Sequence, residues 1–245
     1  MKTVSTIILL ICISMLSFGE KPVRTGEDVI VLMKEKYAES FVRNLTFSQY
    51  VFEYQNGSVV NKTVWHEAYR SPNQLIIKFD SFDSGDGYVF RNDSIYIINN
   101  NQVQNKIEDI HDLMVLGFDV YVQPVKLTID KLTKKGYDIS RLYETSLNGK
   151  SVYCVGASDD NDDSPRFYVD KERLVFIKMI NNNHGRYDEA IFDNYRMING
   201  KYIATEVVFF KNGNPIMKEE YFDIAFPQKL KAKIFDPNYF KGASW

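Results

Sequence analysis

Residues 44–79 read NLTFSQYVFEYQNGSVVNKTVWHEAYRSPNQLIIKF, and this stretch decides the class of fold. Three runs in it are rich in β-branched and aromatic residues, which favour strands. Asn56-Gly57 and Ser71-Pro72-Asn73 separate the runs and are typical of tight turns. Strands joined by such short turns pair with their neighbours in sequence, so the stretch predicts an antiparallel meander. The three predicted strands cover about 44–55, 62–70 and 74–80.

The same pattern continues through most of the chain. Turn residues recur at short intervals, as in Asn92-Asp93, Asn148-Gly149 and Asn212-Gly213. Further strands are predicted at about 87–91, 94–99, 102–107, 141–147, 150–157, 165–170, 173–180, 186–197, 201–211 and 214–225. The tail from 226 to 245 has no clear period. Because no linker, repeat or shift in composition divides the chain, residues 20–245 are expected to form a single domain.

One helix is predicted before the first strand. Thr25 is a good N-cap, and Asp28 stands three residues later. Apolar residues then recur every four positions among charged ones, which indicates an amphipathic helix of about four turns. These apolar residues are Val29, Met33, Tyr37 and Phe41.

The segment from 109 to 136 interrupts the strands, because it lacks turn dipeptides and regains helical spacing. Pro124 is suited to the first position of a helix and Gly136 to its end, so two short helices are predicted. Their apolar residues form two groups, the first with Leu113, Met114, Leu116 and Phe118 and the second with Val125, Leu127, Ile129 and Leu132.

Several strands are apolar on both faces. Between Tyr202 and Phe210, residues of both parities are mostly apolar, whereas a sheet at the surface normally alternates. Two apolar faces predict a strongly curved sheet that is covered in part by helices. Such a sheet either encloses a cavity or is filled by its own aromatic side chains, which make up 14% of the residues. The composition alone leaves both alternatives open.

The N-terminus has the features of a secretory signal peptide. Lys2 precedes an apolar stretch from Val4 to Phe18, which is too short to span a bilayer. Cleavage is expected after Gly19, so residues 1–19 are assigned to the signal. Ile11 before Cys12 does not fit a lipoprotein signal. Cys154 is then the one cysteine of the exported protein, and its place in a predicted strand indicates a small buried apolar residue.

Charge and motifs exclude several classes of function. The chain has 30 basic and 32 acidic residues, whereas domains that bind nucleic acid are usually strongly basic. The three histidines have no metal-ligand spacing, and no H-E-x-x-H, C-x-x-C or G-x-S-x-G motif occurs. The sequence therefore predicts a protein that is not an enzyme and holds no cofactor or metal.

Short motifs resemble those of a known family. Phe47-Ser48-Gln49 is similar to an F-x-Q motif, and residues 69–75 (YRSPNQL) resemble an R-P-N-x-[FL] turn with Ser71 inserted. Asp86-Gly87 and the run 92–96 (NDSIY) both resemble part of an S-D-G-x-x-[LI]-[WY] hairpin. These motifs, and the order of elements over nearly the whole exported chain, resemble the periplasmic lipoprotein carriers of the LolA/LolB-like family.

The resemblance implies a half-open barrel of mainly β structure, with an N-terminal helix and an inserted helical lid over an apolar cavity. It implies a monomer in the periplasm that carries lipoprotein acyl chains or other lipid, with transport partners at the inner and outer membranes. By the same resemblance, Arg70 would reach into the cavity and hydrogen-bond carbonyls of the lid, with Ala68 on the same face. An arginine solvated at the strand end is the alternative.

The remaining candidate residues of the cavity or lid are Phe47, Leu75, Leu113, Met114, Phe118, Leu127 and Leu132. Two other functions stay open. One is a non-enzymatic envelope protein of the same fold that has a filled interior and acts through protein contacts. The other is a secreted enzyme with a site assembled from scattered residues, since fold does not imply function.

Overall fold

The computed structural model describes residues 22–183 and 186–245. One antiparallel sheet of 13 strands dominates it, in the order β6-β5-β4-β3-β2-β1-β15-β14-β11-β10-β9-β8-β7. The first meander consists of β1 (Asn44–Gln55), β2 (Ser58–Arg70), β3 (Gln74–Phe79), β4 (Gly87–Arg91), β5 (Ser94–Asn99) and β6 (Gln102–Glu108). The second consists of β7 (Leu142–Leu147), β8 (Lys150–Val155), β9 (Arg166–Asp170), β10 (Phe176–Asn183), β11 (Arg186–Asp193), β14 (Glu206–Lys211) and β15 (Asn214–Ala225).

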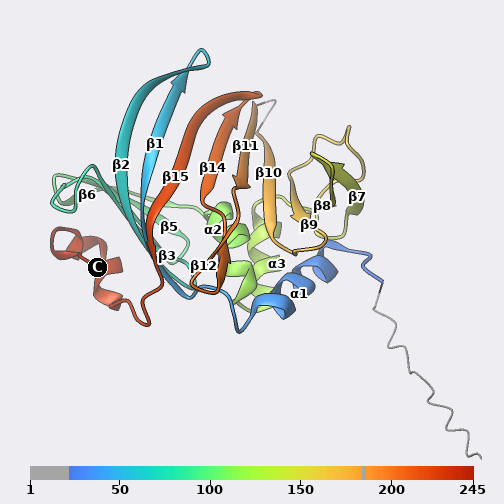
Figure 1. The fold of residues 1–245 in the computed structure, drawn as a ribbon, viewed down its shortest axis with the longest axis horizontal. Helices are drawn as coiled ribbons and strands as arrows, with labels where there is room; N and C mark the ends of the chain where they lie inside the picture. The colour runs from blue at the N-terminus through green and yellow to red at the C-terminus, as the bar shows by residue number, and fades with distance from the viewer. Residues whose placement is uncertain (1–21, 184–185) are drawn as a thin grey trace, which may run out of the picture.

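The two meanders join through β1 and β15, which pair antiparallel from Thr46–Ala225 to Glu53–Met217. Among the described residues β6 and β7 do not pair with each other, so the curved sheet stays open (Figure 1). The predicted fold class, a single curved antiparallel sheet with helices, is confirmed. The predicted signal peptide at 1–19 lies outside the described residues.

Helices lie on the concave side of the sheet (Figure 1). They are α1 (Gly26–Tyr37), α2 (Asp112–Gly117), the 3-10 turn η1 (Asp119–Tyr121) and α3 (Val125–Lys134). Thr25 caps α1 as predicted, because its hydroxyl accepts from Asp28 N while the Asp28 carboxylate accepts from Thr25 N. The helix ends at Tyr37, four residues before Phe41, where the backbone turns. We call residues 112–134 the lid, because they cover the concave face.

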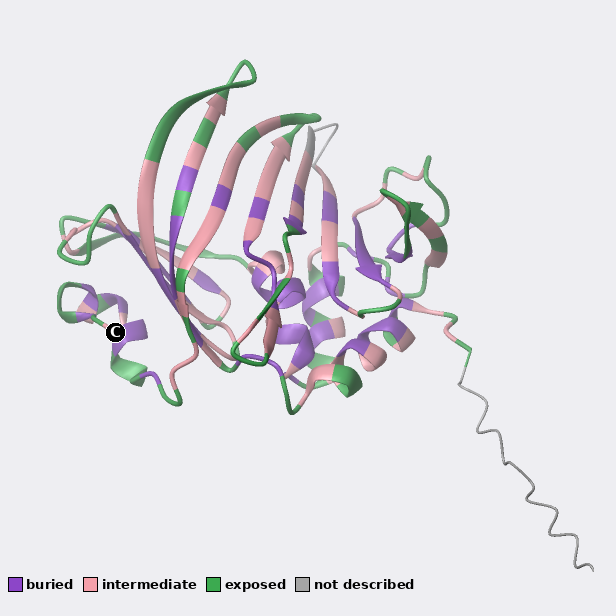
Figure 2. Cartoon of the chain, in the orientation of Figure 1, coloured by how far each residue is buried: buried purple, intermediate pink, exposed green. Residues whose placement is uncertain are grey.

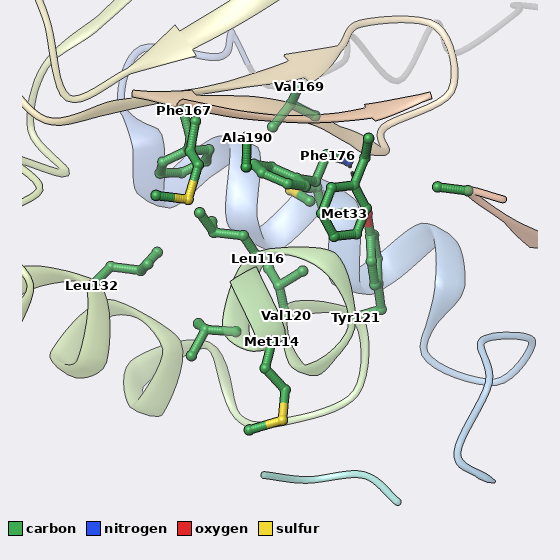
Figure 3. Close-up of a cluster of buried hydrophobic side chains, with 14 of the residues drawn as sticks. Met33, Met114, Leu116, Val120, Tyr121, Leu132, Phe167, Val169, Phe176 and Ala190 are labelled. Atoms are coloured by element: carbon green, nitrogen blue, oxygen red, sulfur yellow. Dashed lines mark hydrogen bonds between the residues drawn. The ribbon is translucent and has the colours of Figure 1, made fainter. Parts of the chain in front are cut away.

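The main core fills the space between the helices and the sheet (Figure 3). Met33 comes from α1, Leu116, Val120 and Leu132 come from the lid, and Phe176 comes from β10. All five side chains are fully or almost fully buried. This packing fixes the lid against the second meander. Cys154 is buried on β8, as the sequence predicts.

The other face of the first meander is covered by the C-terminal segment, residues 226–245 (Figure 2). Two short 3-10 helices, η2 (Ala232–Phe235) and η3 (Pro237–Gly242), bury Phe235 and Phe240 against Ala68, Ile76 and Val89. The sequence shows no period here because these turns are too short to repeat a pattern. Their packing explains why β3 and β4 carry apolar residues on both faces.

Two predicted strands, 186–197 and 201–211, are each broken in the structure. The chain leaves the large sheet after Asp193 and forms a small hairpin from β12 (Arg196–Ile198) and β13 (Lys201–Ile203). Asn194 has a positive φ of 51°, and its carbonyl accepts a 2.8 Å hydrogen bond from the Thr205 hydroxyl. The sequence marks no break at these positions, because Tyr195 and Tyr202 continue the aromatic pattern.

Candidate ligand cavity and its lid

A small cavity lies between α2 and the central strands. Its volume is about 80 Å³, and strands from both meanders contribute to its wall. The wall is mostly apolar, with two carboxyl groups among the aromatic rings. The lining residues are Phe47, Glu67, Tyr69, Leu75, Ile77, His111, Leu113, Met114, Phe118, Phe192, Val207, Phe209, Glu219 and Tyr221.

The size of this cavity limits what it holds in the closed state. A volume of 80 Å³ has room for a few water molecules. Sites for drug-sized ligands usually have volumes of roughly 300–1,000 Å³. A long acyl chain therefore enters this site only if the lid moves away from the sheet.

Five of the predicted residues meet at this cavity. Phe47 and Leu75 contribute from the sheet, and Leu113, Met114 and Phe118 contribute from the lid. Two other lid residues lie elsewhere. Leu132 is fully buried in the main core, but it is not part of the cavity wall. Leu127 is 39% exposed, on the outer side of α3.

Arg70 lies on the opposite face of the sheet from the lid, and the predicted latch is wrong. Its Nε donates to Gln74 Oε1 at 2.8 Å, and its Nη1 donates to the Leu230 carbonyl at 3.2 Å. The guanidinium also lies 5.2 Å from the centre of the Phe235 ring. Arg70 therefore holds the C-terminal segment to the convex face. Arg70 is the last residue of β2, and its side chain is partly buried there.

The error comes from the side-chain alternation of β2. Trp65, Glu67 and Tyr69 point to the concave face, so Ala68 and Arg70 point to the convex face. The expectation that Ala68 faces inward is wrong for the same reason. Ala68 is fully buried, but the C-terminal segment covers it. Because both faces of β2 are covered, its apolar residues do not reveal which parity faces the cavity.

Tyr69, and not Arg70, hydrogen-bonds the sheet to the lid, and its partner there is the carboxylate of Asp119. The Tyr69 hydroxyl donates to Asp119 Oδ1 at 2.5 Å, and the backbone N–H of Asn73 donates to both carboxyl oxygens at 3.1 Å. Asp119 is fully buried. Burial raises its pKa to about 6, against the lowering effect of these hydrogen bonds. The bonds attach η1 of the lid to the turn between β2 and β3.

A second polar contact attaches α3 of the lid. Lys131 Nζ forms an ion pair of 2.6 Å with Asp93 Oδ1, and only 6% of the Lys131 side chain is exposed. The same Asp93 oxygen accepts a 2.8 Å hydrogen bond from Asn73 Nδ2. Two turns of the first meander, at Asn73 and at Asp93, therefore hold the lid through neighbouring contacts.

The lid reaches the second meander through close packing. A Cβ placed on Gly117 would lie 2.7 Å from the Phe192 ring of β11, closer than real side-chain contacts allow. Asp112 at the start of α2 accepts from Asn181 Nδ2 of β10 at 2.8 Å. The lid thus bridges both halves of the sheet.

Two carboxyl groups, Glu67 and Glu219, are buried in the cavity wall. Their exposed fractions are 5% and 9%, and neither forms an ion pair within residues 22–183 and 186–245. Burial is the largest cause that raises the pKa of Glu219 to about 7, offset in part by neighbouring Gln49 and Tyr221. Burial and the nearby Glu219 hold the pKa of Glu67 well above its usual range. Sequence analysis missed both, because single glutamates in strands resemble ordinary surface residues.

Comparison with known proteins identifies the fold. No family profile and no curated protein matches the sequence. Solved structures do match, each at 12% identity over 86% of this chain: a DUF1329 family protein from Desulfovibrio piger (TM-score 0.58, 95% of that chain) and a LolA superfamily protein from Nitrosomonas europaea (TM-score 0.57, 98%). A third is a protein described as an outer membrane lipoprotein-sorting domain from Vibrio parahaemolyticus (TM-score 0.56, 97%).

These likenesses define the class of structure. The chain has a LolA-like fold: an open, curved antiparallel sheet with helices on its concave side. In the described part of the chain, no group of three or more His, Cys, Asp or Glu residues could hold a metal ion. No helix within that part has the length and apolar character needed to cross a membrane.

Proposed function

We propose that this protein is a periplasmic carrier or binder of lipoprotein acyl chains or other lipid, which it holds between the lid and the concave face of the sheet. The observation that carries the proposal is the apolar cavity under the lid. Its wall combines rings from β1, β11 and β14 with side chains of the lid, such as Leu113 and Phe118. The predicted signal peptide and the LolA-like neighbours support export and a carrier role.

The polar contacts between the lid and the first meander are weak compared with the burial of an acyl chain. Burial of one methylene stabilises by about 0.8 kcal/mol, so ten methylenes gain on the order of 8 kcal/mol. A hydrogen bond to a charged group contributes about 1.5–3 kcal/mol net. The lid is attached to the first meander by few such contacts, chiefly at Asp119 and Lys131. An entering chain therefore offsets their loss with apolar burial.

The small closed cavity favours a second candidate, a non-enzymatic envelope protein of the same fold that acts through protein contacts. With about 80 Å³ of empty space, much of the interior is filled by its own side chains. Such a protein would keep its lid closed and bind no lipid. The two functions differ in whether the protein takes up an acyl chain.

Native mass spectrometry of the exported protein, purified from a periplasmic extract without detergent, tests the proposal. A carrier is expected to retain lipid, and after delipidation to bind dodecanol in a saturable titration. Val207→Phe should fill the cavity and weaken dodecanol binding by roughly tenfold. Leu127→Phe is the matched control, because Leu127 is exposed outside the cavity. It should bind like the unmodified protein.

Absence of both bound lipid and dodecanol binding would overturn the carrier proposal and support the filled envelope protein. Binding that Val207→Phe and Leu127→Phe weaken equally would place the ligand elsewhere. Size-exclusion chromatography with light scattering on the same samples tests the expected monomer. Capture of inner- or outer-membrane proteins by the lipid-loaded form tests the expected transport partners.

A further inference from the structure

A polar cluster lies at the apolar wall of the cavity, which two of its members, Glu67 and Glu219, line. It consists of Glu67 on β2, Gln49 on β1 and Glu219 on β15. These are adjacent strands, and their register places the three side chains together. Gln49 pairs with Trp65 and with Tyr221, so Glu67 and Glu219 are its diagonal neighbours on either side.

Gln49 is unusual because its amide is buried without a partner. The residue is fully buried, and neither Nε2 nor Oε1 has a hydrogen-bond partner at ordinary distance and angle within the described chain, although Gln49 lies near enough to Glu219 to lower the pKa of its carboxyl. A buried amide without partners destabilises the fold, because it loses its hydrogen bonds to water. Native proteins rarely keep such a group unless another molecule satisfies it. The Gln49 amide therefore indicates a missing hydrogen-bond partner.

The two carboxyl groups of the cluster indicate what kind of group that partner is. Glu67 and Glu219 make no ion pair in the described chain, although each is at least nine-tenths buried. The other cavity-lining groups that titrate are His111, Tyr69 and Tyr221. His111 supplies no cation, since its Nδ1 accepts a hydrogen bond from Met114 N at 3.2 Å and burial lowers its pKa. Within the described chain, no cation therefore faces either carboxyl.

We propose that Glu67, Glu219 and Gln49 bind the primary ammonium group of an amphiphile whose apolar part lies along the cavity wall. A primary ammonium matches the cluster in its number of donors as well as in its charge. A primary ammonium has three N–H donors and no acceptor. The two carboxylates and Gln49 Oε1 provide three acceptors. A quaternary ammonium has no donor for them, and an anionic head group has neither a donor nor the positive charge that stabilises the ionised carboxylates.

This inference rests on the carrier function and specifies the class of its ligand. It also predicts proton release. Burial holds the carboxyls protonated near neutral pH, with the pKa of Glu219 at about 7. The arriving ammonium stabilises their ionised forms, so binding at pH 6.5 should release protons. Calorimetry in buffers of different ionisation enthalpy counts these protons.

The test compares ligands that share one apolar chain and differ in head group. Dodecylamine, dodecyltrimethylammonium, dodecanol and laurate are titrated into the delipidated full-length exported protein. We expect dodecylamine to bind roughly tenfold or more tighter than dodecanol, with proton release, since hydrogen bonds to charged groups contribute about 1.5–3 kcal/mol. Laurate should bind more weakly than dodecanol. Dodecyltrimethylammonium should not reach the affinity of the primary amine.

Variants then test whether the cluster causes the preference for the amine over the alcohol. The double variant Glu67→Gln, Glu219→Gln should bind amine and alcohol equally. Glu220→Gln is the matched control, because it removes one charge from the next residue of β15, where the side chain is 40% exposed and pairs with Lys218. It should keep the full preference for the amine. Thermal unfolding checks that both variants fold.

The outcomes separate the two proposals. If none of the four ligands binds, the carrier function itself fails. If dodecanol binds but dodecylamine gains nothing and releases no proton, the carrier function stands and the ammonium site is wrong. Equal binding of the primary and the quaternary amine would also overturn the site, because charge alone would then account for the preference.

Discussion

The Tyr69 hydroxyl on β2 donates a 2.5 Å hydrogen bond to the carboxylate of Asp119 in the lid. The two residues are 50 positions apart, and both are almost completely buried. A bond to a charged acceptor in a buried place is stronger than an exposed one. This contact therefore joins the first meander to the lid at the point where a ligand would have to separate them.

Tyr69→Phe removes that donor and keeps the ring. Asp119 then depends on the Asn73 N–H, and a buried carboxylate is left with too few donors. We expect a loss of roughly 1–3 kcal/mol in the free energy of unfolding and faster hydrogen exchange in residues 112–134. Urea unfolding and exchange mass spectrometry measure the two effects.

Arg70→Leu is the control for Tyr69→Phe. Its guanidinium contacts Leu230 and Phe235 on the other face of the sheet. The variant should speed exchange in the C-terminal segment and leave the lid protected. Faster exchange of the lid in Arg70→Leu, with no change in Tyr69→Phe, would show that the lid is held in another way.

Leu132 and Leu127 give a matched pair on α3. Leu132 is fully buried in the main core, whereas Leu127 is 39% exposed. Replacement of a buried leucine by alanine usually costs about 2–5 kcal/mol, and an exposed one costs within about 0.5 kcal/mol. We expect these values for Leu132→Ala and Leu127→Ala in urea unfolding. Similar losses for both would mean that α3 is rotated relative to the structure.

The order of strands and helices was predictable because it depends on local chemistry. The turn residue Asn56 at φ 52° and the N-cap Thr25 act within a few residues of themselves. The inward direction of β2 was not predictable in this way. Ala68 is buried by residues more than 160 positions later in the chain, so its apolar character does not indicate the cavity.

The polar residues of the site were missed for the same reason. Glu67 and Glu219 are ordinary residues in their local sequence, and they become unusual only through the pairing of β2, β1 and β15. From the likeness to the carriers, the polar contact with the lid was expected at Arg70. In the structure the preceding residue, Tyr69, makes it. Phe47, Leu75 and Phe118 line the cavity, because an apolar residue on the concave face needs only the correct general location.

Gly117→Ala tests whether the lid needs its close approach to β11. The added methyl would meet the Phe192 ring at 2.7 Å, so one of the two must shift. Overpacking of this kind typically costs about 1–3 kcal/mol. We expect lower stability, faster exchange in α2 and easier uptake of dodecanol, because the closed state is weakened. Unchanged exchange in α2 would show that Phe192 moves aside freely.

Glu219→Gln should stabilise the ligand-free protein at high pH. In the folded protein burial raises the pKa of Glu219 from 4.5 to about 7, so the fold favours the protonated form. The favourable contribution of this group is complete below pH 4.5 and is lost as the pH rises through about 7. Glutamine stays neutral, so the variant should match the unmodified protein near pH 4 and exceed it at pH 8. The difference is on the order of 3 kcal/mol, since each pKa unit corresponds to about 1.4 kcal/mol.

Urea unfolding between pH 4 and pH 8 measures this difference. Glu220→Gln is the control, because its ion pair with Lys218 is partly exposed and such pairs contribute less than about 1 kcal/mol. It should show no comparable dependence on pH. Dodecylamine should remove most of the difference at pH 8, because it stabilises the ionised carboxylate of the unmodified protein and not the neutral glutamine. A variant that is less stable than the unmodified protein at pH 8 without ligand would mean that Glu219 is ionised and already compensated in the closed fold.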